Sequence, residues 1–306
     1  MIHVPISTTC NGDAVPHRTL LTQSAPRTRT FEALSPHGFS RVAYHEWGTP
    51  DNPRVVICVH GLSRTGRDFD VVGEAMSSTH RVLAVDLPGR GDSDWLADPG
   101  DYVFPTYLGA LTALIARSGA REVAWVGTSL GGLLGMVMAA QPDTPVTRLV
   151  VNDIGPVIEP GSLARIGEYI GLDPTFATYG EVASYVRTIS SPFGVLADAQ
   201  WNHLVRTSVV QRPDGRWGMH YDPGIAVPFR AASAPPDLWK LWDAITCPTL
   251  VIRGADSDLL AASTAVAMSG RGPHPRILTF DGVGHAPMLL GREQVEPLCQ
   301  FLRAEP

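Results

Sequence analysis

Val126-Gly127-Thr128-Ser129-Leu130-Gly131-Gly132 joins one short apolar run, residues 122–126, to a second, residues 133–140. This arrangement predicts a strand, a sharp turn and a helix, with Ser129 at the turn. The two glycines that flank the serine leave room where the turn packs against the neighbouring strand and helix. The positive end of the helix dipole points at the serine. The pattern predicts a nucleophilic serine, although Gly-x-Ser-x-Gly also arises by chance in a glycine-rich chain.

Strand-like and helical segments alternate on both sides of this turn. Apolar, β-branched runs predict buried strands at residues 55–59, 81–85, 149–151, 249–252 and 276–280. Apolar residues at helical spacing predict helices at residues 107–117, 261–268 and 293–302. Alternating residues 39–47 predict an earlier strand, in a hairpin. The alternation predicts an α/β fold with a doubly wound, mostly parallel sheet.

The alternation is interrupted once, which divides the chain into regions. Residues 156–244 contain helical patterns and many aromatic residues but no buried parallel strand. They predict a helical cap over the carboxyl edge of the sheet, with residues 31–155 and 245–306 forming the core. Residues 1–30 are rich in Ser, Thr, Pro and Arg without apolar periodicity, and are expected to be a flexible extension.

Composition narrows the classes of partner. The 306-residue chain carries a formal net charge of -6 and no run of Lys or Arg, so nucleic-acid binding has no support. It has neither a signal peptide pattern nor an apolar stretch long enough to span a membrane. Its four cysteines, Cys10, Cys58, Cys247 and Cys299, have the spacing of neither a disulfide framework nor a zinc site. We expect a cytoplasmic protein with a small-molecule partner and no metal; the oligomeric state stays open.

Reactive side chains follow the predicted strands. Ligands of open α/β sheets bind beyond the carboxyl ends of the strands, where these side chains converge. A serine needs a base to take its proton, and His285, in the glycine-flanked loop after the last strand, is the best candidate. The base needs a carboxylate. Asp258 is the favoured carboxylate, because it lies where the loop after a predicted strand turns into a helix. Asp256 and Asp153 remain alternatives.

A tetrahedral oxyanion also needs hydrogen-bond donors held in place. The backbone N–H of Leu130 lies at the start of the predicted helix, and that of Leu62 lies in the loop after His60 and Gly61. These two groups are the expected oxyanion hole. Arg64 and Arg67 lie close to this loop in sequence and leave room for a carboxylate-bearing substrate, although Arg67 fits the start of a helix equally well.

Residues 40–303 resemble the α/β-hydrolase fold family. The motifs that carry the resemblance are the turn at 127–132, His60-Gly61, the loop Asp86-Leu87-Pro88-Gly89-Arg90-Gly91-Asp92-Ser93, and the order Ser129, Asp258, His285. The resemblance implies a Ser–His–Asp triad and an oxyanion hole from Leu62 and Leu130. It also implies a cap after the sixth strand and no cofactor.

The expected function is hydrolysis of a small or medium, largely apolar carboxylic ester or lactone through an acyl-enzyme. Epoxide hydrolases and haloalkane dehalogenases of this fold carry an aspartate where this chain has Ser129, which argues against both. Two alternatives remain open. One is a C–C bond hydrolase of the meta-cleavage-product type, which the loop at 60–66 weakens; the other is a sensor that binds a ligand with little turnover.

Overall fold

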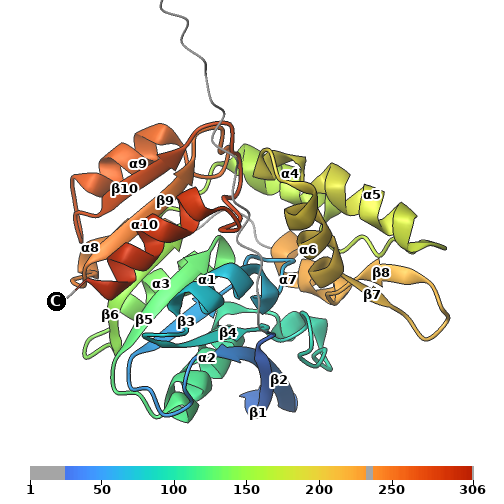
Figure 1. Ribbon diagram of the computed structural model, residues 1–306, viewed down its shortest axis with the longest axis horizontal. Coiled ribbons are helices and arrows are strands. Elements are labelled where there is room, and N and C mark those ends of the chain that lie inside the picture. The colour runs from blue at the N-terminus through green and yellow to red at the C-terminus, as the bar shows by residue number, and fades with distance from the viewer. Residues whose placement is uncertain (1–24, 232–236, 305–306) are drawn as a thin grey trace, which may run out of the picture.

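The computed structural model describes residues 25–231 and 237–304. In this part of the chain, one eight-stranded sheet has the order β1-β2-β4-β3-β5-β6-β9-β10 (Figure 1). Its strands are β1 (Arg27–Ser35), β2 (Gly38–Trp47), β3 (Val55–Val59), β4 (Arg81–Val85), β5 (Val123–Thr128), β6 (Val146–Asn152), β9 (Thr249–Gly254) and β10 (Arg276–Phe280). The pairings that involve β2 are antiparallel, and all others in the sheet are parallel. The predicted doubly wound, mostly parallel sheet is confirmed.

Helices cover both faces of the sheet. Those of the core are α1 (Asp70–Met76), α2 (Phe104–Ser118), α3 (Leu130–Ala139), α8 (Trp239–Ala244), α9 (Ala262–Ser269) and α10 (Arg292–Arg303). Helices α1 and α10 contact each other and lie in front of the sheet in Figure 1, whereas α3 contacts both α2 and α8. All five residues of β3 are buried, because this central strand has neighbours on both sides and helices on both faces.

The first strand departs from the sequence prediction. Residues 27–30 belong to β1 and not to a flexible extension, while residues 1–24 of that predicted extension lie outside the described residues. Residues 27–30 show no apolar pattern, because all four are exposed. It is held by its ladder to β2 and by ion pairs from Arg27 and Arg29 to the buried Glu46, with N–O distances of 3.3 and 3.5 Å.

The segment between β6 and β9 forms a lobe to one side of the sheet in Figure 1. It contains α4 (Pro160–Tyr169), α5 (Tyr179–Ile189), α6 (Asp198–Ser208), α7 (Ala226–Ala231) and the antiparallel pair β7 (Val209–Gln211) and β8 (Trp217–Met219). Helix α8 falls within the predicted cap boundaries but contacts α3 of the core, and its Trp242 is fully buried. This packing places α8 with the core.

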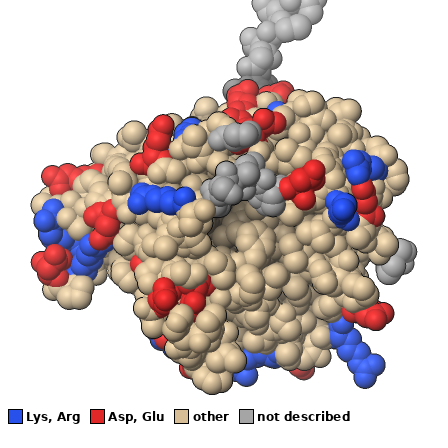
Figure 2. Space-filling view, turned by 180° about the vertical axis from the view of Figure 1, so that it is seen from behind, with Lys and Arg blue, Asp and Glu red and all other residues tan. Residues whose placement is uncertain are grey.

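Within residues 25–231 and 237–304, no helix combines the length and the apolar character that a membrane crossing requires. On the face shown in Figure 2, Lys and Arg side chains stand in small, separate groups, several of them beside Asp and Glu side chains. This face offers no continuous basic track.

Candidate active site

Ser129 occupies a tight turn between β5 and α3, with a positive φ of 52°. The neighbouring glycines make this turn possible. A Cβ atom on Gly131 would overlap the carbonyl oxygen of Val59, and one on Gly127 would overlap the carbonyl oxygen of Gly131. The strand–turn–helix expectation is therefore confirmed, together with the steric reason for both glycines.

Replacing Gly131 by alanine should lower the free energy of unfolding by more than about 2 kcal/mol, since backbone atoms of β3 must move to admit a methyl group. Gly109→Ala is the matched control, because Gly109 lies in α2 and has nothing within 4 Å of the added Cβ. Alanine favours a helix, so this control should be neutral or stabilised by up to about 1 kcal/mol. Urea unfolding measures both; equal stability of the two variants would contradict the packing argument.

Three side chains form a chain of hydrogen bonds at the carboxyl edge of the sheet. The Nε2 atom of His285 lies 3.0 Å from the Oγ atom of Ser129, and its Nδ1 atom lies 2.8 Å from Oδ2 of Asp153. The residues come from the ends of β5, β10 and β6, and Asp153 is fully buried. The geometry provides a hydroxyl, a base within reach of its proton, and a carboxylate that orients the base.

The buried carboxylate of Asp153 has further donors. The backbone N–H of Gly254 donates to Oδ1 at 2.9 Å, and the hydroxyl of Ser257 donates to Oδ2 at 2.7 Å. Gly254 is the last residue of β9, and Ser257 lies in the loop that follows it. Hydrogen bonds of this kind hold a carboxylate in place.

The expectation that Asp258 orients His285 is wrong. Asp258 forms an ion pair with Arg165 of α4, at 2.7 Å, and its side chain is 47% exposed. Partial burial acts to raise the pKa of Asp258, but the hydrogen bonds and charge of Arg165 outweigh it and lower that pKa. Asp256 is exposed as well. Strands β6 and β9 are neighbours, so the loops after both place carboxylates at the same edge of the sheet. Only the carboxylate after β6 reaches the imidazole of His285.

Sequence reasoning also missed two residues that support this chain of hydrogen bonds. Asn152 donates through Nδ2 to Oγ1 of Thr128 and to the carbonyl oxygen of Pro287, at 3.0 and 2.8 Å. It thereby links the Ser129 turn to the His285 loop. Ser257 is the second, and its only local signal was its place between Asp256 and Asp258, the two competing carboxylates.

The loop after β3 approaches Ser129 closely. A Cβ atom on Gly61 would lie 3.6 Å from the Cβ atom of Ser129. His60 fixes this loop: its Nδ1–H donates to the carbonyl oxygen of Gly61 at 2.6 Å, while its Nε2 accepts the N–H of Leu87 at 3.0 Å. The carbonyl of Gly61 shares a peptide group with the N–H of Leu62. His60 thus sets the orientation of one of the two expected oxyanion donors.

His60 should make stability depend on pH. Burial lowers its pKa from 6.5 to about 4, so between these values the unfolded chain binds a proton that the folded chain does not. The free energy of unfolding should therefore fall by about 3 kcal/mol on this account as the pH drops from 7 to 4. His60→Asn keeps a donor for Gly61 without titrating.

Urea unfolding at both pH values tests this prediction. The fall in stability between pH 7 and pH 4 should be about 3 kcal/mol smaller in His60→Asn than in the unmodified chain. His274→Asn, at an exposed position, is the control and should show the full fall. His80, whose pKa burial also lowers to about 4, adds to the fall in every variant. A fall of the same size in His60→Asn would refute the assignment.

The arginines near the loop are already paired. Arg64 donates to both carboxylate oxygens of Asp68 and to Oγ of Ser208 at the end of α6, so it links the core to the cap. Arg67 makes a two-pronged ion pair with the buried Asp70. Both arginines therefore already bind carboxylates of the chain itself. This argues against the expectation that they bind a carboxylate-bearing substrate.

The chain is similar to several known proteins. Residues 56–298 match the model of the Alpha/beta hydrolase family. The chain is 45% identical over 287 residues to a 3-hydroxybutyrate-oligomer hydrolase from Cupriavidus necator, a match that covers 91% of this chain and 98% of the relative. It is 27% identical to a pimeloyl-[acyl-carrier protein] methyl ester esterase from Xanthomonas campestris, over 82% of this chain and 96% of that protein.

A solved structure shows the same fold. The crystal structure of an alpha/beta hydrolase from Novosphingobium aromaticivorans superimposes with a TM-score of 0.82 at 35% identity, and covers 92% of this chain and 99% of that one. The family match spans most of the chain, and the curated relatives are hydrolases of ester bonds. The chain therefore belongs to the alpha/beta hydrolase family and is an ester-hydrolysing enzyme.

Proposed function

We propose that the chain cleaves carboxylic esters through an acyl-enzyme on Ser129. The observation that carries this proposal is the hydrogen-bonded chain from Ser129 through His285 to Asp153. The Oγ atom of Ser129 attacks the ester carbonyl while Nε2 of His285 takes its proton. The imidazolium, stabilised by the carboxylate of Asp153, returns this proton to the leaving alkoxide. Water, activated by the same imidazole, then releases the acid and restores the serine.

The negative charge that forms on the carbonyl oxygen needs donors. We assign this role to the backbone N–H groups of Leu62 and Leu130, as the sequence suggested. Leu130 opens α3, so its N–H lies at the positive end of the helix dipole. Arg90 supports the Leu62 side of this oxyanion hole, because its Nε donates to the carbonyl oxygen of Leu62 at 2.9 Å.

For the substrate, we propose short oligoesters of a hydroxy acid such as 3-hydroxybutyrate. The relative from Cupriavidus necator, which covers nearly the whole of both chains, supports this choice. Each bond in such an oligomer joins a carboxyl group to a secondary hydroxyl group and is an ordinary ester. The same triad cleaves it without any added group, and each product is a free hydroxy acid or a shorter oligomer.

Hydrolysis of the linear 3-hydroxybutyrate dimer and trimer, followed by release of monomer, tests this function. A p-nitrophenyl ester series from acetate to dodecanoate measures chain-length preference in the same preparation. We expect turnover of the oligomers and of the short p-nitrophenyl esters. Turnover of p-nitrophenyl esters without oligomers would reject the substrate alone. Inertness toward every ester, with decolourisation of a meta-cleavage product, would favour C–C bond hydrolysis instead.

A further inference from the structure

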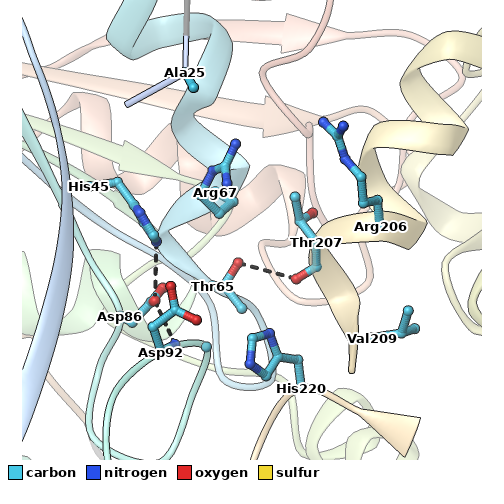
Figure 3. A pocket seen from close by; sticks show the side chains of 11 residues that line it. Ala25, His45, Thr65, Arg67, Asp86, Asp92, Arg206, Thr207, Val209 and His220 are labelled. Atoms are coloured by element: carbon cyan, nitrogen blue, oxygen red, sulfur yellow. Dashed lines mark hydrogen bonds and ion pairs between the residues drawn. The ribbon is translucent and has the colours of Figure 1, made fainter. Parts of the chain in front are cut away.

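A pocket of about 550 Å³ lies between core and cap, and Ser129, His285 and Asp153 are not among the residues that line it. Figure 3 shows its wall. On the core side it is formed by β2 and by the loops after β3 and β4; on the cap side it is formed by the end of α6, the start of β7 and His220. Its lining is mainly polar, which suits a hydrated ligand better than an apolar acyl chain.

Three side chains of types that can ligate a metal ion converge on the core side of this pocket. The ligand atoms of His45, Asp86 and Asp92 all lie within 4.8 Å of one another. His45 and Asp86 are each 1% exposed, whereas Asp92 is exposed and gives access from solvent. In Figure 3, the imidazole of His45 and the two carboxyl groups point toward one another. They come from β2 and from two places in the loop after β4.

The two buried members are held in place by other groups. Oγ1 of Thr28 lies 3.2 Å from Nδ1 of His45, on the side of the ring away from the cluster. The N–H groups of Gly66 and Asp92 donate to Oδ1 and Oδ2 of Asp86, at 2.7 and 2.9 Å. Partners of this kind orient the ligands of metal sites.

The spacing of the buried pair also suits a metal ion. Nε2 of His45 and Oδ2 of Asp86 are 3.2 Å apart. An ion about 2.1 Å from each atom, the usual distance for zinc, would subtend an angle of about 100° between them. This angle falls between the tetrahedral and octahedral values. An ion can therefore lie between these two atoms with little movement of either side chain.

The charges around the cluster favour a cation. Arg67 lines the same pocket but is paired with Asp70, and Arg206 is exposed at the opposite wall, on α6. In the described part of the chain, the carboxylate of Asp92 has no hydrogen-bond or ion-pair partner of its own.

We propose that His45, Asp86 and Asp92 bind a divalent transition metal ion of the Zn²⁺ type, with water completing its coordination. One imidazole nitrogen and two carboxylate oxygens are ligands that zinc accepts, and the pocket has room for the waters. This site is separate from the ester-cleaving residues and does not depend on their function. Cysteine spacings do not reveal this site, because its ligands are histidine and aspartate side chains from separate segments.

Calorimetric titration of the full chain with Zn²⁺ tests the proposal. We expect one saturable site, and affinity at least tenfold lower in both His45→Gln and Asp92→Asn. Asp94→Asn is the matched control, since Asp94 lies in the same loop but pairs with Arg41, and it should bind as the unmodified chain does. Asp86 is left unchanged because it holds the backbone of its loop.

Circular dichroism in the absence of metal first verifies that each variant is folded. Saturable zinc binding lost in His45→Gln and Asp92→Asn but kept in Asp94→Asn supports the site. Three results would overturn it: no saturable binding, equal binding by all the variants, or binding of Mg²⁺ as tight as that of Zn²⁺. Equal binding would mean adventitious uptake elsewhere. Tight Mg²⁺ binding would mean that the imidazole is not a ligand.

Discussion

Ser129→Ala is expected to lower kcat for ester hydrolysis by about 10⁵-fold or more, because no other group supplies the attacking oxygen. The residual rate would come from the oxyanion donors and substrate binding alone. The fold should survive, since alanine removes only a hydroxyl group from the turn. The measurement is kcat on a short p-nitrophenyl ester, together with the thermal unfolding midpoint of the same sample.

The control is Ser184→Ala, a change at an exposed serine of α5 that should leave kcat unaltered. A Ser129→Ala variant that is folded and retains more than a tenth of the unmodified activity would remove Ser129 from the mechanism. A variant that fails to fold is distinguished by its unfolding curve, and Ser129→Gly, which suits the positive φ of this turn, then takes its place.

Asp153→Asn carries the second large effect, a fall in kcat of about 10⁴-fold. An amide at this position no longer stabilises the imidazolium, and it presents an N–H where His285 needs an acceptor. Asp258→Asn should change kcat less than threefold, because Asp258 contacts Arg165 and not His285. Loss of that partly exposed ion pair should lower the free energy of unfolding by less than about 1 kcal/mol.

Measured side by side on one ester, the two asparagine variants decide which carboxylate acts on His285. Asp256→Asn, at the third candidate position, completes the set and should behave as the unmodified enzyme does. A fall in Asp258→Asn as large as that in Asp153→Asn would mean that the loop after β9 rearranges during catalysis. The assignment of Asp153 would then have to be abandoned.

Most of the fold could be predicted because its signals are local. The β-branched runs at 55–59, 81–85 and 276–280 gave strands with the bounds that the structure shows. The glycines around Ser129 predicted the turn for the same reason. A larger side chain there would collide with neighbouring backbone, so the requirement shows in a few adjacent residues. Strand β1 was missed in part because its first residues are stabilised by pairing and charge, which leave no apolar pattern.

The candidate site was only partly predictable. Ser129 and His285 each lie in a distinctive loop, and the structure brings them together. The carboxylate was misassigned because Asp153 and Asp258 follow adjacent parallel strands, and strand order alone does not separate them. What separates them is Arg165 in the cap, which binds Asp258, and Ser257, which binds Asp153. Such contacts between distant segments leave no trace in local sequence patterns.

The central claim is that Ser129, activated by His285, forms the covalent intermediate. Mass-spectrometric peptide mapping after treatment with a p-nitrophenyl phosphonate ester tests this claim most directly, because the phosphonate adduct does not hydrolyse readily. We expect one adduct per chain, located on Ser129, with its formation matching the loss of esterase activity and much slower in Asp153→Asn. Complete loss of activity with the adduct on another residue would contradict the account.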